Sequence, residues 1–359
     1  MNYRLTACAA AFFLARLAPA EPTADETARF LAGLPMHGTS LESLAANAEW
    51  VRHAMEFDDA WRPFDTRQLA QIRIWAAEFL MPEYADRGNV FYYFSGPDFL
   101  YAQTFFPNAT NYVLCGLEPV GTPPDVTKLP RGALPSALAS LRKAMNSVLS
   151  FSFFITKEMK GDLTQTQFSG TLPVLLVFLA RSHCRVDSVE LIDLDKTGAI
   201  AAGKGATHGV KIGFFGPGGR AQTLYYFTAD LSDDGIKANP AIHRFSESLG
   251  IGHSLLKAAS YLMHAGGFDR TREFLLTHSN VIVEDDSGIP YRYLSPAKWN
   301  VRLFGNYRAP IELFKQYPQP ALAEAFVGSA APDLHFGFGY RWQRRESCLL
   351  LARRKSSEP

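Results

Sequence analysis

Two uncharged apolar segments joined by a short helical segment, within residues 89–121, constrain the fold of this chain most. Val90 to Phe94 contains only valine and aromatic residues, and Asn111 to Leu117 is a second uncharged segment. Runs of this kind are typical of strands buried on both faces, as in a parallel sheet. Between them, Phe99 to Phe106 has apolar residues at helical spacing and stops at Pro107. Because parallel strands need a crossover connection, we expect a right-handed strand-helix-strand unit here.

The turn after the first of these strands holds the candidate ligand-binding residues Ser95, Gly96 and Asp98. Gly96 can adopt a positive φ, and Pro97 suits the first turn of a helix. Backbone N–H groups at such a helix start favour an anion. Glu118 follows the second strand, and parallel strands end at the same edge of a sheet. We therefore expect the turn and Glu118 to border one ligand-binding crevice.

This pattern resembles a degenerate Rossmann-type unit of the kind found in dinucleotide-binding and methyltransferase-like folds. In such folds, an acidic residue placed like Glu118 accepts the hydroxyl groups of a ribose. The G-x-G-x-x-G fingerprint has three glycines where this chain has only Gly96. The resemblance thus implies a nucleotide-type crevice without a close approach for a pyrophosphate. The alternative is an ordinary crossover with an exposed glutamate.

The remaining segments predict one α/β domain over residues 21–359. Helices within residues 24–81 are expected to cover one face of the sheet, and residues 185–230 to form an inserted antiparallel β-meander. The aromatic segment 336–342 and the apolar segment 347–352 predict a C-terminal β-hairpin. A parallel sheet that closes with an antiparallel hairpin is also how the methyltransferase-like fold ends.

A second candidate site follows a short apolar strand at residues 281–283. Glu284, Asp285 and Asp286 come next and are followed by a Ser-Gly turn. Clustered carboxylates could bind a ligand, hold a hard cation such as calcium or magnesium, or act as an acid/base pair, and they also favour exposed turns. Their spacing matches no metal-binding motif, so we predict no metal site. Upstream, Ser254 to His264 has small and apolar residues at helical spacing and predicts a helix.

The first 20 residues resemble a secretory signal peptide. Arg4 precedes an apolar run from Leu5 to Ala15 that is too short to span a bilayer, and Ala18-Pro19-Ala20 fits the cleavage rule. We therefore expect cleavage after Ala20 and a periplasmic or secreted protein. With 36 basic and 35 acidic residues, the chain has no general attraction for nucleic acid. No later segment predicts a membrane span.

Three hypotheses about function follow from the sequence. The first is an exported protein that binds a small ligand between the turn and Glu118. The second is a non-enzymatic envelope protein built on a degenerate Rossmann-like scaffold, and the third is a methyltransferase-like enzyme. The sequence assigns no catalytic residue, no cofactor and no oligomeric state.

Overall fold

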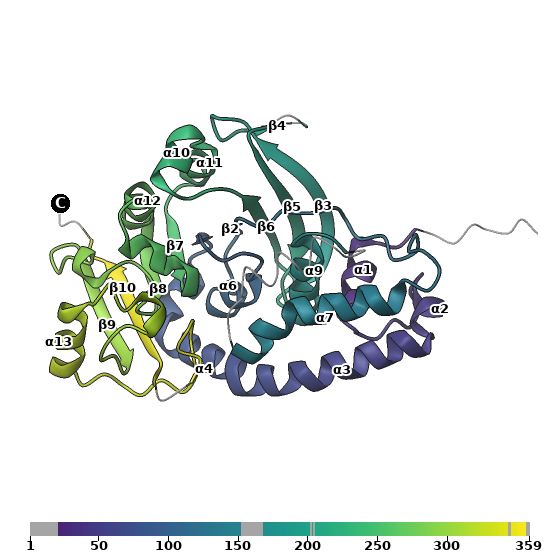
Figure 1. Cartoon of the computed structure of the whole chain (residues 1–359), viewed down its shortest axis with the longest axis horizontal. Helices are drawn as coiled ribbons and strands as arrows, with labels where there is room; N and C mark the ends of the chain where they lie inside the picture. Colours follow the sequence, from purple (N-terminus) through teal and green to yellow (C-terminus); the bar gives the residue numbers. More distant parts are fainter. Residues whose placement is uncertain (1–20, 152–167, 202, 204, 344–345, 357–359) are drawn as a thin grey trace, which may run out of the picture.

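A computed structural model describes residues 21–151, 168–201, 203, 205–343 and 346–356 (Figure 1). The predicted signal peptide lies outside these residues. In the described part of the chain, one ten-stranded sheet runs through the molecule. Its strands are β1 (Asn89–Tyr92), β2 (Asn111–Gly116), β3 (Arg185–Leu194), β4 (Ile200–Ala201), β5 (Thr207–Phe215), β6 (Ala221–Thr228), β7 (Gly252–Leu256), β8 (Ser279–Glu284), β9 (Trp299–Gly305) and β10 (Cys348–Arg354).

The strand order is β4-β3-β5-β6-β2-β1-β7-β8-β10-β9, with β1 and β2 at the centre. Strand β1 runs parallel to β2 on one side and to β7 on the other, and β2–β6 and β7–β8 are also parallel pairs. The predicted parallel crossover from β1 to β2 is therefore confirmed. The pairs β3–β5 and β5–β6 are antiparallel, as are β10–β8 and β10–β9.

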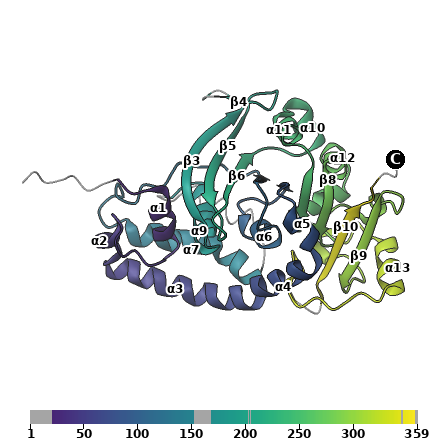
Figure 2. The same ribbon diagram turned by 180° about the vertical axis from the view of Figure 1, so that it is seen from behind.

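Helices cover both faces of the sheet, and a hydrophobic core lies between the sheet and the helices on each face. Helices α3 and α4 run along the same side of the molecule in both views (Figure 2). The first core contains side chains from α1 (Ala24–Leu31), α3 (Ala48–Phe64), α4 (Ala70–Phe79), α6 (Phe99–Phe105), α7 (Leu134–Phe151) and α9 (Leu172–Arg181). The second core contains side chains from α10 (Asp233–Ala238), α11 (Ala241–Leu249), α12 (Asp269–His278) and α13 (Pro320–Gly328).

Shorter helical segments complete the described chain. They are α2 (Glu42–Ala45), η1 (Asp65–Leu69), α5 (Met81–Ala85), η2 (Ala258–His264), η3 (Tyr291–Tyr293) and η4 (Glu312–Phe314). Among the helices that the structure describes, none combines the length and the apolar character that a membrane span needs.

The packing of β1 explains why residues 90–94 contain no charged side chain. Val90 and Tyr92 belong to the first core, whereas Phe91 and Tyr93 belong to the second. Successive side chains of a strand point to opposite faces, so a strand with helices on both faces needs apolar residues at every position.

Two sequence-based predictions about secondary structure are wrong. Ser254 to His264 is not one helix, because Gly252–Leu256 forms the buried strand β7 and only Ala258–His264 is a 3₁₀ helix. Gly250, with a φ of 87°, ends α11 and lets the chain turn into this strand. The leucines and alanines that favoured a helix have two separate causes. Those of β7 are buried on both faces of the sheet, and those after Lys257 belong to the short 3₁₀ helix.

The predicted C-terminal hairpin is also incorrect. Strand β10 pairs with β8 and β9, while segment 336–342 contributes one isolated bridge, Phe338 to Arg341. Gly339 has a φ of 56°, which breaks an extended strand. Phe336 and Phe338 are buried in the first core, where they meet Phe105. The alternating aromatic residues of segment 336–342 therefore reflect ring packing by an irregular segment and not a β-strand.

Candidate functional site

The turn after β1 is tightly wound and is attached to the end of β2. Phe94 and Gly96 have φ values of 62° and 56°, which is a strained conformation for phenylalanine. The amide of Gly96 donates to the carbonyl of Cys115 over 3.2 Å. The hydroxyl of Ser95 donates to the carbonyl of Gly96 over 2.8 Å. These bonds hold the turn beside the carboxyl end of the neighbouring strand.

Gly116, the last residue of β2, allows this close approach. A Cβ atom built on Gly116 would lie 2.9 Å from the Cα of Gly96 and 2.3 Å from Oε2 of Glu118. Any side chain at this position would therefore separate the turn from Glu118.

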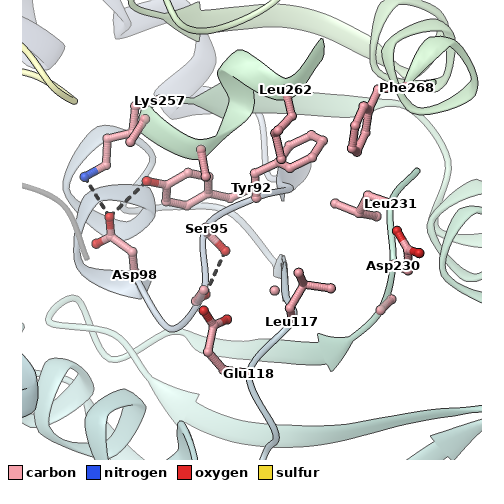
Figure 3. A pocket seen from close by; sticks show the side chains of 16 residues that line it. Tyr92, Ser95, Asp98, Leu117, Glu118, Asp230, Leu231, Lys257, Leu262 and Phe268 are labelled. Carbon is pink, nitrogen blue, oxygen red and sulfur yellow. Dashed lines mark hydrogen bonds and ion pairs between the residues drawn. The ribbon is translucent and has the colours of Figure 1, made fainter. Parts of the chain in front are cut away.

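Glu118 is anchored by its backbone and directs its carboxylate toward the turn. Its carbonyl accepts hydrogen bonds from the hydroxyls of Tyr226, at 2.9 Å, and Thr228, at 2.7 Å. The side chain points toward Ser95 (Figure 3), and the residue is 3% exposed. The structure thus places Glu118 and the turn on one rim.

On the other side of the turn, Asp98 forms a buried ion pair with Lys257. The Nζ of Lys257 lies 2.7 Å from Oδ2 of Asp98, and the hydroxyl of Tyr92 donates to the same oxygen over 2.9 Å. Lys257 also lies over the ring of Tyr101, 3.6 Å from its centroid. Burial raises the pKa of Asp98 and lowers the pKa of Lys257, and each charge partly reverses the shift of the other.

These groups border a cavity of about 250 Å³ at the carboxyl ends of β1, β2, β6 and β7. Ligands in open α/β sheets gather at this edge. Of the predicted site residues, Ser95, Gly96, Asp98 and Glu118 line the cavity. Most of the remaining wall is apolar and is formed by Phe94, Leu117, Leu231, Ala258, Ala259, Leu262 and Phe268 (Figure 3).

The acidic segment Glu284, Asp285 and Asp286 is buried and does not line this cavity, although the charge of Asp285 acts on Lys257 in the cavity wall. Glu284 accepts the amide of Ile289 over 2.7 Å, and Asp285 accepts the amide of Ser287 over 3.0 Å. Burial raises the pKa of Glu284 well above its usual range. The side chains of Glu284 and Asp285 therefore accept hydrogen bonds from amides of their own turn.

Asp286 forms a two-pronged ion pair with Arg341. Its carboxylate oxygens lie 2.7 Å and 3.0 Å from Nε and Nη2 of the guanidinium. The thiol of Cys348 lies 3.5 Å from Oδ1 of the same carboxylate. This pair attaches the acidic turn to the segment before β10.

Two charged residues of the cavity wall were not predicted from the sequence, Lys257 and Asp230. Lys257 directly follows β7, which the sequence predicted as part of a helix. A strand assignment for residues 252–256 would have placed Lys257 at the same sheet edge as the turn, because β7 is parallel to β1. Asp230 comes two residues after β6, at the same edge.

The buried Asp285 predicts a measurable pH dependence of stability. Burial, and then the charge of Asp286, raise its pKa to about 7 from 3.8. The folded state therefore keeps a proton that the unfolded chain releases, so this group's contribution to stability falls as the pH rises from 3.8 to 7. Asp285→Asn removes the titration and retains an oxygen acceptor for Ser287. We expect the variant to match the wild type at pH 4 and to exceed its free energy of unfolding by about 4 kcal/mol at pH 8.

Urea titrations of both proteins between pH 4 and pH 8 measure this difference. Burial lowers the pKa values of His53, His243 and His264 to about 4, so their contribution to stability rises with pH. Both proteins contain these histidines, so the difference between the two proteins does not include this effect. A constant difference across the whole pH range would contradict the assignment.

No protein-family model matches this chain, and neither a curated protein nor a solved structure matches it. Within the described residues, no group of three or more histidine, cysteine, aspartate or glutamate side chains is arranged to hold a metal ion.

Proposed function

We propose that this protein binds a small organic ligand in the cavity between the Ser95–Asp98 turn and Glu118. One observation carries the proposal, the mainly apolar cavity into which the buried carboxylate of Glu118 points. Concave apolar pockets with a few converging polar groups are the usual form of a small-molecule site. A crevice filled by aromatic side chains would have favoured the alternative, a scaffold without ligand.

The proposal includes export of the protein. Residues 1–20 have the charge, apolar run and cleavage pattern of a secretory signal, which supports a periplasmic or secreted location. The ligand would then be a molecule present outside the cytoplasm.

A methyltransferase-like enzyme is the second candidate. The strand order β6-β2-β1-β7-β8-β10-β9, with antiparallel β10 between β8 and β9, supports it. Glu118 has the place of a ribose-binding acid in such folds. The single glycine of the turn, Gly96, argues against it. A rise in melting temperature with S-adenosylmethionine that Glu118→Gln abolishes would favour this candidate.

A cavity-filling substitution tests ligand binding. Leu262 lies on the cavity wall, and Leu262→Trp would place an indole ring in the ligand's volume (Figure 3). We expect a thermal-shift screen of small metabolites to find compounds that raise the melting temperature of the wild type, because a ligand that binds only the folded state stabilises it. We expect Leu262→Trp to lose that rise.

Leu313→Trp is the matched control, since Leu313 is 52% exposed and lies outside the cavity. It should retain the full rise. A screen without a stabilising compound, or an equal rise in Leu262→Trp, would reject the proposed function.

A further inference from the structure

We infer that the cavity selects a cationic ligand, with an ammonium or similar group beside Glu118 and an apolar body against the opposite wall. This inference rests on the proposed function and adds the chemical class of the ligand. Three observations support it. They are the burial of Glu118 without a cationic partner among the described residues, the ion pair of Lys257 with Asp98, and the hydrogen bonds of the turn.

Glu118 is a buried carboxylate without a cationic partner among the described residues. The hydroxyl of Tyr226 lies 3.4 Å from Oε2 of its side chain, and this hydroxyl also donates to the carbonyl of Glu118 at 2.9 Å. A carboxylate removed from water loses hydration energy unless a donor or a cation replaces it. A ligand ammonium in the cavity would supply both, as a charge-assisted hydrogen bond.

Lys257 is the cationic residue of the cavity wall, and Asp98 already holds its charge. Asp230 adds a further carboxylate on the wall, and its Oδ1 accepts the amide of Ser232. The wall therefore has three carboxylates and one ammonium group. This excess of negative charge repels phosphate and carboxylate ligands and attracts cations.

The turn does not offset this repulsion. The N–H group of Gly96 donates to the carbonyl of Cys115, and Pro97 has no N–H group. Helix α6 after the turn has only seven residues, and the carboxylate of Asp98 stands at its first end. The anion site that the sequence suggested at this turn thus lacks the N–H groups of residues 96 and 97.

The opposite wall fits an apolar body. Leu231, Leu262 and Phe268 lie across the cavity from Asp98 (Figure 3). An aromatic or branched aliphatic group would bury its surface there while its charged end reached Glu118.

Two matched series of compounds test the inference. The first is phenethylamine, 2-phenylethanol and phenylacetate, and the second is tryptamine, tryptophol and indole-3-acetate. Within each series the ring is constant and the charge changes from positive through neutral to negative. We expect calorimetry to show the amine binding about tenfold or more tighter than the alcohol, and the carboxylate weakest.

Glu118→Gln should reduce amine affinity about tenfold or more and leave alcohol affinity almost unchanged. Glu324→Gln is the matched control, because Glu324 is an exposed residue of α13 away from the cavity, and it should leave the order unchanged.

Carboxylates that bind as tightly as the amines, or an amine preference that survives Glu118→Gln, would overturn the inference. If Leu262→Trp abolished the binding of those carboxylates, the proposed function would stand and only the charge preference would be wrong. Binding that survives Leu262→Trp, or no binding by any of the six compounds, would count against both.

Discussion

Replacement of Lys257 by methionine is expected to lower the free energy of unfolding by about 3–5 kcal/mol at pH 7. Removal of one partner of a buried ion pair leaves the other charge uncompensated, which costs about this much. Here the remaining charge would be that of Asp98, which is 2% exposed and keeps only weaker neutral donors such as Tyr92. Urea denaturation followed by fluorescence measures the change.

Two further variants make this expectation specific. Asp98→Asn combined with Lys257→Met removes both charges and should recover most of the lost stability. Lys315→Met removes a lysine whose ion pair with Glu312 is exposed, and it should cost less than about 1 kcal/mol. A double variant as unstable as Lys257→Met would show that packing, not charge, sets the cost.

Replacement of Arg341 by methionine is the second large expected loss, again about 3–5 kcal/mol. It leaves the carboxylate of Asp286, whose side chain is 1% exposed, without its guanidinium partner. Asp286→Asn in the same chain should restore much of the stability, because an amide carries no charge to compensate.

Arg341→Met also tests whether the acidic turn contributes to ligand binding. Because Glu284, Asp285 and Asp286 do not line the cavity, Arg341→Met protein that is still folded at low temperature should bind phenethylamine as tightly as the wild type. A large loss of affinity in this variant would show that the acidic turn takes part in binding after all.

The centre of the fold could be predicted from the sequence because its signals are local. The uncharged runs around Phe91 and Val113 indicate strands buried on both faces, and parallel pairing follows from the helix between them. Glu118 and the turn were predicted to share one edge for the same reason, and the structure places both on the cavity wall.

The remaining part of the site depends on contacts between distant segments. Lys257 was missed because the segment from Ser254 has helical spacing, and only its pairing with β1 makes it a strand. Asp286 was predicted at a site because three adjacent carboxylates are usually solvated or functional. Its partner Arg341 lies 55 residues later, in a segment whose aromatic pattern predicted a strand.

A crystal structure of the protein with tryptamine would show whether an amine binds in the cavity beside Glu118. We expect the ammonium group within hydrogen-bond distance of the carboxylate of Glu118, and the indole ring against Leu262 and Phe268. Tryptamine bound elsewhere on the molecule, with the cavity beside Glu118 empty or closed, would contradict this expectation.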